Sequence, residues 1–490
     1  MRRILGSMLA IALASCVRYH PAPLEPARMA STLEARSLSD SGLRAFIRRN
    51  VAPPPATAPG TPPPWDLTTL TLAAFYYSPD LDVARAEYAV ARAGIVTAGA
   101  RPNPTLSVVP TRTVGETEQA AAVERGLTPW ALSFSLDVPL ELFHRRGYRV
   151  VHARQLANSA RFGIAQAAWN VRDRVRAALL DLATARARAG VQRTLVRRRE
   201  ELVALLERRL AVGEASQIDV SRERTLRDQA RLDLRGDERA AAEALSGVAT
   251  AIGVPAVALE RVPITLDSSD ALPPATVLPA ADSLRRLALL GRADVLAALA
   301  GYDAAESALA LEVARQYPSI HLLPGLAWDR GEEKISFGTS SLLPVFNLNR
   351  GPIAEAAARR GERAERVRQL QMRVLGTLDS ALVGYRAASG DVAAADSLLA
   401  SQRRTSAGVE AQFQRGEVDR VALVSTRIEV STIEMARLDA LFAARRALGR
   451  LEDAIQRPLA GGPVPAARQE QPDQPPAGGV PPSRSQPSRQ

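Results

Sequence analysis

The chain has 490 residues, a mass of 52.5 kDa and a formal net charge of +11. Hydrophobic residues make up 46% of it but aromatic residues only 4%, which favours close-packed, alanine-rich helices over a thick sheet sandwich. One cysteine excludes a disulfide framework and a multi-cysteine metal site. Charges alternate in sign along helical stretches, which is typical of a solvated face. Without a helix-turn-helix, zinc or aromatic-basic sheet motif, we expect no nucleic-acid binding.

The first residues have the pattern of a secretion signal. A basic start is followed by the short apolar stretch Ile4 to Ala14, too short to span a bilayer, so we expect a signal peptide over 1–15. Leu13-Ala14-Ser15-Cys16 resembles a bacterial lipobox, which predicts a lipid anchor on Cys16. Val17 is compatible with an outer-membrane destination. An ordinary signal peptide with an incidental cysteine is the alternative.

Three further segments are predicted to lie outside the folded repeats. Residues 16–65 contain two triple-proline runs and are expected to form an extended, Pro-rich linker. Residues 259–279 would join the two halves, and 459–490 is a tail of Pro, Gln, Ser, Gly and Arg that we expect to be disordered. No run of about 18 apolar residues follows the signal, so a membrane crossing would require a β-barrel.

An internal duplication relates 66–258 to 280–458. At a constant offset of 214 residues, the first part of each half shares Tyr88 with Tyr302, Arg101 with Arg315, Pro104 with Pro318 and Pro110 with Pro324. Each half is predicted to contain a helix, a β-hairpin and a long helical hairpin. The helices are expected at 68–100 and 281–315, the strands at 105–113, 130–140, 318–328 and 334–344, and the long helices at 148–211 and 352–413, with returns to about 251 and 455.

The strands alternate as membrane strands do. Leu132, Phe134, Leu136 and Val138 alternate with polar residues, and a length of about 10 residues fits a tilted membrane strand. Aromatic residues flank the hairpins, where the girdles of a membrane barrel belong, although the rim of a soluble sheet also carries such residues. These girdle candidates are Trp130, Trp328, Phe143 and Phe346.

Four strands cannot close a barrel, and lipid does not tolerate open sheet edges. Several copies must therefore associate: two would give eight strands filled by side chains, and three would give twelve with room for a lumen. Each long helix would reach roughly 90–100 Å at 1.5 Å per residue. Such a helix needs lateral partners, so we expect coiled-coil packing.

The chain resembles the TolC-type outer-membrane efflux family over about 66–457. The matching stretches are Ser78-Pro79-Asp80-Leu81, Ala100-Arg101-Pro102-Asn103-Pro104, Tyr317-Pro318-Ser319-Ile320, Leu343-Pro344-Val345-Phe346, Val212-Gly213 with Ile218-Asp219-Val220, and Phe413-Gln414-Arg415-Gly416. The resemblance implies a mainly α fold with a small membrane β-barrel portion. It implies a homotrimer with a twelve-strand barrel in the outer membrane, a periplasmic α-barrel, a periplasmic adaptor protein at the tip and an inner-membrane pump behind it.

The resemblance also assigns roles at the periplasmic tip. Val212, Gly213, Asp219, Phe413 and Gly416 match the family's tip motifs, which implies adaptor docking or tip packing, although the two glycines would also be needed simply to turn the chain. The positions that carry an acidic aperture ring in the best-known members are here Ala422 and Ser425. Asp219 and Glu223 remain candidates for charge near the aperture.

No catalytic or cofactor pattern is evident. The four histidines, His20, His144, His152 and His321, are scattered without metal-ligand spacing, and no phosphate-binding glycine loop precedes a helix. We therefore expect no enzyme activity, no cofactor and no metal. The predicted function is an exit duct for passive export in a tripartite efflux pump or type I secretion system. The alternative is a lipid-anchored periplasmic coiled-coil scaffold without a pore.

Overall fold

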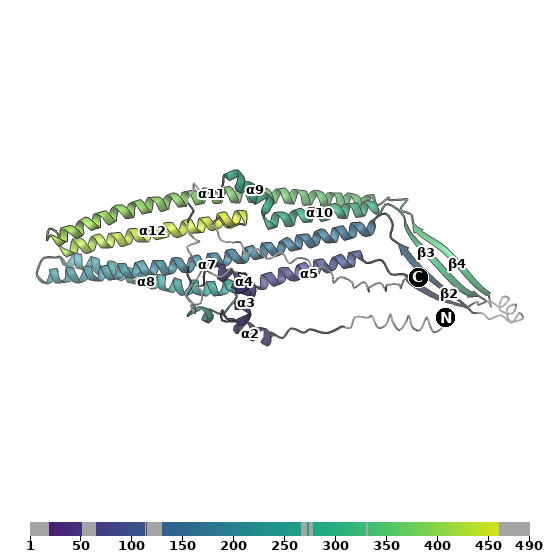
Figure 1. The fold of residues 1–490 in the computed structure, drawn as a ribbon, viewed down its shortest axis with the longest axis horizontal. Helices are drawn as coiled ribbons and strands as arrows, with labels where there is room; N and C mark the ends of the chain where they lie inside the picture. Colours follow the sequence, from purple (N-terminus) through teal and green to yellow (C-terminus); the bar gives the residue numbers. More distant parts are fainter. Residues whose placement is uncertain are drawn as a thin grey trace, which may run out of the picture.

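The computed structural model describes residues 19–50, 65–112, 114, 130–265, 272–273, 278–329 and 332–459. The predicted signal peptide, Cys16 and the tail beyond Leu459 lie outside these residues. The described chain forms an elongated molecule with a four-stranded sheet at one end and paired long helices at the other (Figure 1).

The two halves have the same order of elements, as the duplication predicts. Each half has two shorter helices, two strands and two long helices. In the first half these are α4 (Leu67–Tyr77), α5 (Pro79–Gly99), β1 (Thr105–Arg112), β2 (Trp130–Leu140), α7 (Arg145–Ala211) and α8 (Gln217–Ile252). In the second they are α9 (Ala281–Gly291), α10 (Ala293–Ala314), β3 (Ser319–Asp329), β4 (Glu332–Leu342), α11 (Arg350–Gln414) and α12 (Arg420–Ile455).

The helix that opens each half is divided in two, where the sequence predicts one. Ser78 has extended backbone angles and accepts a hydrogen bond from the Leu81 N–H, so it ends α4 and caps α5. Pro79 follows at the first helical position, where its missing N–H is not needed. In the second half, Arg292 is extended between α9 and α10.

The segment expected to be an extended linker contains two helices, so this prediction is wrong for 19–50. They are α2 (Pro26–Glu34) and α3 (Ser41–Asn50), and the Asp40 carboxylate accepts a hydrogen bond from the Leu43 N–H at the start of α3. Leu38 and Leu43 are buried in the core of the first half. Of the two helices only α3 has a buried residue, Leu43, so the segment docks on this core through α3 and the preceding Leu38.

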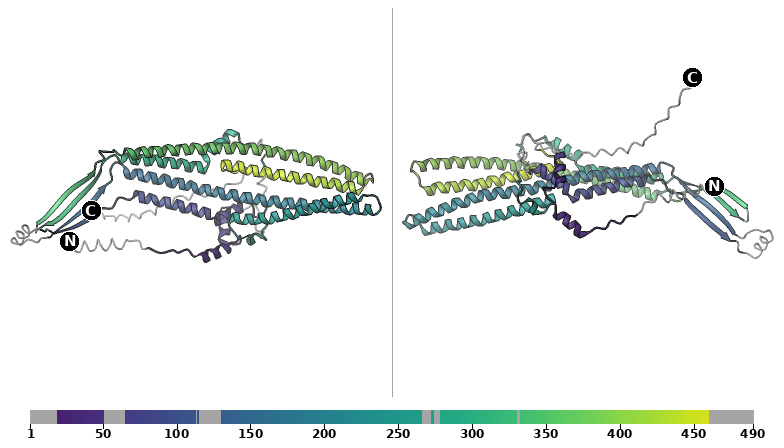
Figure 2. Two further views of the ribbon diagram at one scale, coloured as in Figure 1. Left: turned by 180° about the vertical axis from the view of Figure 1, so that it is seen from behind. Right: turned by 60° about the horizontal axis from the view of Figure 1, so that its bottom comes forward.

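The long helices pair as antiparallel hairpins, α7 with α8 and α11 with α12, and α12 also lies along α7 (Figures 1 and 2). With 67 residues, α7 is about 100 Å long. α5 and α10 flank its sheet-proximal half. A helix of this length with charged exposed positions is stabilised by such lateral packing rather than by its own propensity.

Each half has its own hydrophobic core at mid-length. In the first half, α3, α4, α7 and α8 enclose residues including Leu70, Val175 and Ile252. In the second, α9, α11 and α12 enclose Leu284, Tyr385 and Leu448 among others. The Tyr385 hydroxyl, otherwise costly to bury, donates to the Pro273 carbonyl.

The four strands form one antiparallel sheet in the order β1-β2-β3-β4. Two hairpins thus join side by side through β2 and β3, with Leu132 opposite Trp328 and Leu140 opposite Ile320. The strand bounds lie within two residues of those predicted, because period-two alternation and flanking prolines mark a strand clearly. Within the described part of the chain, none of the helices combines the length and the apolar character that a bilayer crossing requires.

Candidate functional site

One face of the sheet is apolar and exposed. Residues directly opposite each other in neighbouring strands share a face, so the register assigns each side chain to one side. The apolar residues of this face are Leu106, Val108, Pro110, Trp130, Leu132, Phe134, Leu136, Val138, Leu140, Ile320, Leu322, Pro324, Leu326, Trp328, Ile335 and Phe337; Arg112, Glu333, Thr339 and Ser341 are its polar members. Ile335 is 86% exposed and Phe337 75%, so this patch has no partner within the described chain.

The opposite face is largely polar. Its polar residues are Thr105, Ser107, Thr111, Ser133, Ser135, Asp137, Ser319, His321, Asp329, Glu332, Lys334, Ser336 and Ser340, and its apolar members are Val109, Ala131, Pro139, Leu323, Ala327 and Leu342. His321 lies 2.8 Å from Asp137, and Lys334 lies 2.6 Å from Asp329. Two faces of such different polarity fit a sheet with lipid or protein on one side and water on the other.

Both outer strands of the sheet have an open edge. Among the described strands, β1 pairs only with β2 and β4 only with β3, and every residue of β1 is exposed. Each edge offers unpaired backbone N–H and C=O groups along 8 or 11 residues. Open edges of this length are available to pair with further strands.

The four predicted girdle residues lie at the two ends of the sheet. Trp130 and Trp328 stand at the end away from the helices, and both are on the apolar face. Phe143 and Phe346 stand at the helical end, where Phe346 is fully exposed and Phe143 stacks on Tyr317 with ring centroids 4.7 Å apart.

Matching left-handed turns connect each hairpin to its long helix. Phe143 and His144 before α7, and Leu348 and Asn349 before α11, all have positive φ. For residues other than glycine this conformation is rare and costs about 1 kcal/mol or more each. The strain is tolerated because the turn is fixed from both sides, for example by the Asn349 side chain, which donates to the Glu312 carbonyl at the end of α10.

Arginines at the start of α7 hold the C-terminal ends of α5 and α10. Arg145 donates to the Ala314 and Tyr317 carbonyls, and Arg146 donates to the Gly99 carbonyl. Arg149 pairs with Glu141 and donates to the carbonyls that end α5. Cations at helix C-termini satisfy free carbonyls and complement the helix dipole. The sheet is therefore fixed rigidly to the helical part.

At the far end of the molecule, the two hairpin tips have the same backbone geometry. Gly213 and Gly416 have φ of 77° and 78°. In each tip the residue after the glycine donates to a carbonyl five residues earlier, Glu214 to Arg209 and Glu417 to Gln412. This is the Schellman helix ending, which favours glycine because it needs a left-handed residue.

Two of the remaining tip residues differ in exposure. Val212 is 70% exposed, whereas Phe413 is half-buried. Asp219 is exposed in the first turn of α8, where its N–H donates to the Ser216 side chain that caps the helix. The structure thus places all five predicted tip residues at or within a turn of the two hairpin ends.

The aperture candidates lie on α8 and α12. Glu223 is not available as a free charge, because it pairs with Arg199 at 3.4 Å. Ala422 and Ser425 are half-buried in the first turns of α12. The acidic residue beside them is Asp419, which accepts a hydrogen bond from the Ala422 N–H. Sequence reasoning missed Asp419, although an Asp before an apolar-periodic stretch is a recognisable helix cap.

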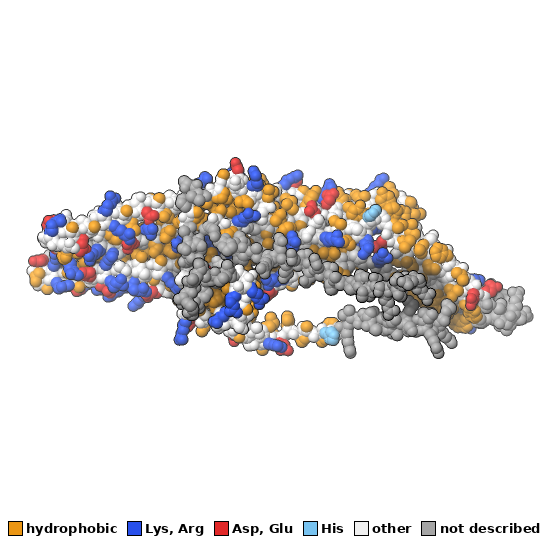
Figure 3. Space-filling view, in the orientation of Figure 1, with side chains coloured by type: hydrophobic (Ala, Val, Ile, Leu, Met, Phe, Trp, Pro, Cys, Tyr) orange, Lys and Arg blue, Asp and Glu red, His pale blue; other side chains and the backbone are white. Residues whose placement is uncertain are grey.

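Asp419 also joins the two hairpins, because the Arg209 guanidinium at the end of α7 pairs with its carboxylate. Donation from the Ala422 N–H, and then from Arg209, lowers the pKa of the Asp419 carboxyl. Farther from the tip, α7 and α12 stay in contact: Arg420 pairs with Glu201, and Leu202 packs on Val424 and Ile428. Charged side chains cover this end of the molecule (Figure 3).

A buried ion pair joins the halves at mid-length and was not predicted. Arg176 of α7 donates to Glu452 of α12 at 2.7 Å, with both side chains at most 5% exposed. Gly449 lies against the guanidinium: a Cβ at this position would stand 3.0 Å from the Arg176 Nη1, so a larger residue would press on the pair. Beside the pair, burial first and the Asp453 carboxylate second raise the pKa of the Asp173 carboxyl.

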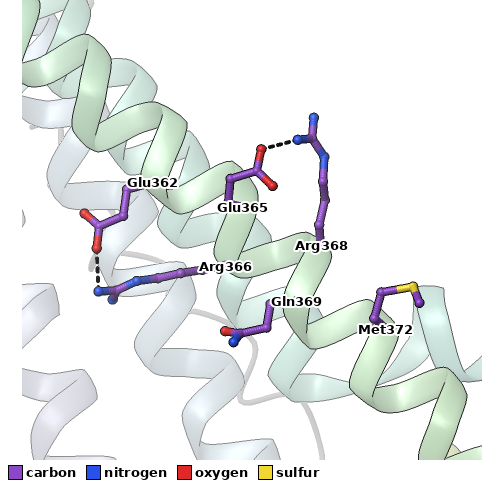
Figure 4. Close-up of a pocket in the computed structure, with 6 residues that line it drawn as sticks. All are labelled: Glu362, Glu365, Arg366, Arg368, Gln369 and Met372. Carbon is purple, nitrogen blue, oxygen red and sulfur yellow. Dashed lines mark hydrogen bonds and ion pairs between the residues drawn. The ribbon is translucent and has the colours of Figure 1, made fainter.

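The surface offers no constellation for catalysis in the described residues. The hollow in Figure 4 is lined by Glu362, Glu365, Arg366, Arg368, Gln369 and Met372, all from α11. Glu362 pairs with Arg366 and Glu365 with Arg368, so the charges are matched within one helix face. No other described element contributes a side chain to this hollow, so groups from different elements do not meet there as they do in an active site. Across the residues that the structure describes, no group of three or more His, Cys, Asp or Glu could hold a metal.

Comparison with known proteins agrees with this arrangement. Residues 74–254 match the model of the outer membrane efflux protein family. The first half of the chain is therefore similar to a family of outer-membrane efflux proteins over these residues. Among curated protein sequences, none matches the chain.

Several solved structures share the fold across most of the chain. One is the outer membrane protein VceC of Vibrio cholerae, with 21% identity and a TM-score of 0.63 over 79% of this chain and 95% of VceC. CusC aligns with 18% identity and a TM-score of 0.64 over 82% of this chain and 98% of its own. The outer-membrane channel OprN aligns with 19% identity and a TM-score of 0.64 over 81% of this chain and 90% of OprN.

Proposed function

We propose that this chain is one subunit of an outer-membrane exit duct that passively exports small molecules or ions from the periplasm. The observation that carries the proposal is the sheet: it is exposed, apolar on one face, polar on the other and open at both edges. A sheet of this kind is stable in lipid only if copies join edge to edge into a closed barrel.

Three copies would pair β4 of one with β1 of the next. That closure gives twelve strands, enough for a lumen with the polar face inward and the apolar face toward lipid. Phe143 and Phe346 would then lie at the periplasmic interface, and Trp130 and Trp328 at the outer one. The long helices would continue the duct into the periplasm as a helical barrel.

The hairpin tips would receive a periplasmic adaptor protein, and through it an inner-membrane pump of a tripartite system or type I secretion system. Val212, Gly213, Asp219, Phe413 and Gly416 are the proposed docking or tip-packing residues. Asp219, Glu223, Ala422 and Ser425 remain the candidates around the aperture, together with Asp419. The Arg209–Asp419 pair would hold the two hairpins of one subunit together there.

A lipid on Cys16 would add an anchor in the outer membrane. The signal peptide and the cysteine follow from the sequence alone. Mass spectrometry of the mature N-terminus measures the modification directly, and Cys16→Ala should abolish it while leaving the fold intact.

The experiment that tests the proposal uses detergent-purified, full-length protein. Heat-modifiable mobility on a gel reports a stable oligomer, and recordings in planar lipid bilayers report a pore. We expect a trimer that dissociates on boiling and gives discrete conductance steps. A monomer without conductance would refute the duct and favour the lipid-anchored coiled-coil scaffold.

A further inference from the structure

Arginines are concentrated where the sheet joins the helices. Each strand continues one helix there: α5 leads into β1, β2 into α7, α10 into β3 and β4 into α11. The four connections and the helical turns beside them contain the arginines Arg101, Arg145, Arg146, Arg149, Arg315 and Arg350. The same stretches contain two acidic residues, Glu141 and Glu312, so this junction is strongly basic.

The carboxylates near the junction do not neutralise it. Glu141 pairs with Arg149, and Glu312 pairs with Arg315. The closest acidic residues beyond them have other contacts, which are Asp137 with His321 on the sheet, Glu306 with Arg360 between α10 and α11, and Glu355 with Arg359 on α11. On α7, no acidic residue precedes Asp173. On α5 the nearest one, Glu87, stands about three turns from the helix end.

Two of the arginines have no structural role in the described chain. Arg145 and Arg146 hold carbonyls at the ends of α10 and α5. Arg101 and Arg350 are exposed, and with the described residues their side chains form neither a hydrogen bond nor an ion pair. Arg350 opens α11, where the helix dipole disfavours a cation and the first turn has no acidic residue. Its position therefore requires another explanation.

These two arginines lie on opposite lateral edges of the molecule. At one edge β1 follows α5, which packs on α7; at the other, β4 leads into α11, which packs on α10 and α12. All four connections lie at the same end of the helices (Figure 1). Pairing of β4 with β1 of the next copy would therefore bring Arg350 of one copy toward Arg101 of the next. Two cations without a carboxylate repel each other unless an anion lies between them.

Large apolar side chains are exposed at the same junction. Phe346 is fully exposed and Val345 is 63% exposed, and Leu142, Phe143 and Leu343 are exposed beside them. Figure 3 shows hydrophobic side chains gathered where the helices meet the sheet. Arginines next to an exposed apolar surface match the two parts of an anionic phospholipid, its charged headgroup and its acyl chains. A free phosphate ion would leave the apolar part uncovered.

Resting on the proposed membrane position of the sheet, we propose that this junction binds an anionic phospholipid at each boundary between copies, from the leaflet on the helical side. Arg101 of one copy and Arg350 of the next donate to oxygens of its phosphate diester, and its acyl chains lie along Phe346 and Val345. Guanidinium suits this ligand because it presents parallel N–H donors and stays charged. The lipid offsets the repulsion between the arginines and so stabilises the closed assembly.

The test measures lipid binding to the detergent-purified, full-length protein by native mass spectrometry. The probes are phosphatidylglycerol and phosphatidylcholine with identical acyl chains, and we expect the trimer to bind phosphatidylglycerol more tightly. Arg101→Gln with Arg350→Gln should lower the affinity for phosphatidylglycerol about tenfold and change that for phosphatidylcholine less than about twofold. Arg373→Gln is the matched control, because Arg373 is exposed on α11 about 35 Å further from the sheet.

Two further arms separate the parts of the ligand. Phe346→Ser should weaken both lipids, because both have acyl chains. Inorganic phosphate in excess should not displace phosphatidylglycerol, and displacement would show an anion site instead of a lipid site.

Equal affinity for the two lipids, or a preference for phosphatidylglycerol that persists in the double variant, would overturn the proposal. Heat-modifiable mobility checks that each variant assembles. If the double variant does not, Arg350→Gln alone should lower the affinity for phosphatidylglycerol about threefold or more. Absence of a trimer in the unmodified protein would instead refute the duct itself.

Discussion

The two halves of the chain share their backbone geometry and differ in the chemistry of their tips. Both hairpins end in the same glycine-dependent turn and both long helices begin after two left-handed residues. Yet the first tip exposes Val212 and Ile218, at 70% and 79%, whereas the second carries an Arg415–Glu417 ion pair at the same place. After a duplication, the fold constrains which residues can form the turns, whereas the exposed side chains are free to change with the partner that each tip binds. A contact partner that distinguishes the tips is thus expected to bind the first through apolar surface and the second through charge.

The largest expected effect comes from breaking the contact between the halves. Glu452→Leu leaves Arg176 buried without its carboxylate, which should cost about 3–5 kcal/mol of unfolding free energy. The double variant Arg176→Met with Glu452→Leu should recover part of it, because both charges of the buried pair are then gone, while Arg172, which lies 3.6 Å from Glu452, still loses that carboxylate. Chemical denaturation followed by the helical circular dichroism signal measures both.

The control for that series is the exposed Arg446–Asp181 pair, which also joins α12 to α7. Arg446→Ala should change the unfolding free energy by at most about 1 kcal/mol, since exposed ion pairs are weak. If Glu452→Leu cost no more than Arg446→Ala, the buried pair would have no special part in joining the halves.

The sequence is sufficient to predict elements but not such contacts. Alternation in Leu132 to Val138 and the glycines at 213 and 416 mark strands and turns because these signals are local. Arg176 and Glu452 are 276 residues apart, and Asp137 and His321 are 184 apart, so only the packing of the halves brings them together. The same reason explains why the helix at 41–50 escapes prediction: Leu43 packs into a core contributed by distant residues.

The shared tip geometry predicts equal sensitivity at the two glycines. Gly213→Val and Gly416→Val each place a β-branched side chain at positive φ, which should cost about 1–2 kcal/mol. Among the described residues, no neighbouring atom lies within 4 Å of where a Cβ would stand at either site, so strain rather than collision causes the loss. Thermal unfolding measures it. A large loss at one tip and none at the other would contradict the equivalence of the turns.

The two tips differ in how the stabilisation by their helix caps depends on pH. Ser216 caps α8 and Asp419 caps α12, and replacing either by alanine should cost about 1 kcal/mol at pH 7. The pKa of the Asp419 carboxyl is lowered, so its contribution is present above the pKa of the unfolded chain and is lost as the pH falls through the lower folded value.

Unfolding measured between pH 7 and pH 3 therefore distinguishes the caps. The cost of Asp419→Ala should shrink toward the acidic end, because the capping group itself is a carboxylate. The cost of Ser216→Ala should change less, because the Ser216 hydroxyl does not titrate in this range and only its hydrogen bond to the Asp219 carboxylate depends on pH. Parallel curves for the two variants would show that the Asp419 charge, and with it the Arg209 contact, contributes nothing beyond a neutral cap.

The smallest expected effect on stability, and the most specific on binding, is at the exposed apolar residues of the first tip. Val212→Ser removes a side chain that is 70% exposed, so the unfolding free energy should change by less than about 0.5 kcal/mol. Arg415→Ser is the counterpart at the second tip, where it removes the partner of Glu417. Titration of an immobilised adaptor protein with each variant, at low and high salt, separates the two contacts. Val212→Ser should weaken binding equally at both salt concentrations, because a buried apolar contact is not screened. Any loss of binding in Arg415→Ser should diminish as the salt concentration rises. If the two variants respond to salt in the same way, the chemical difference between the tips has no bearing on how the partner binds.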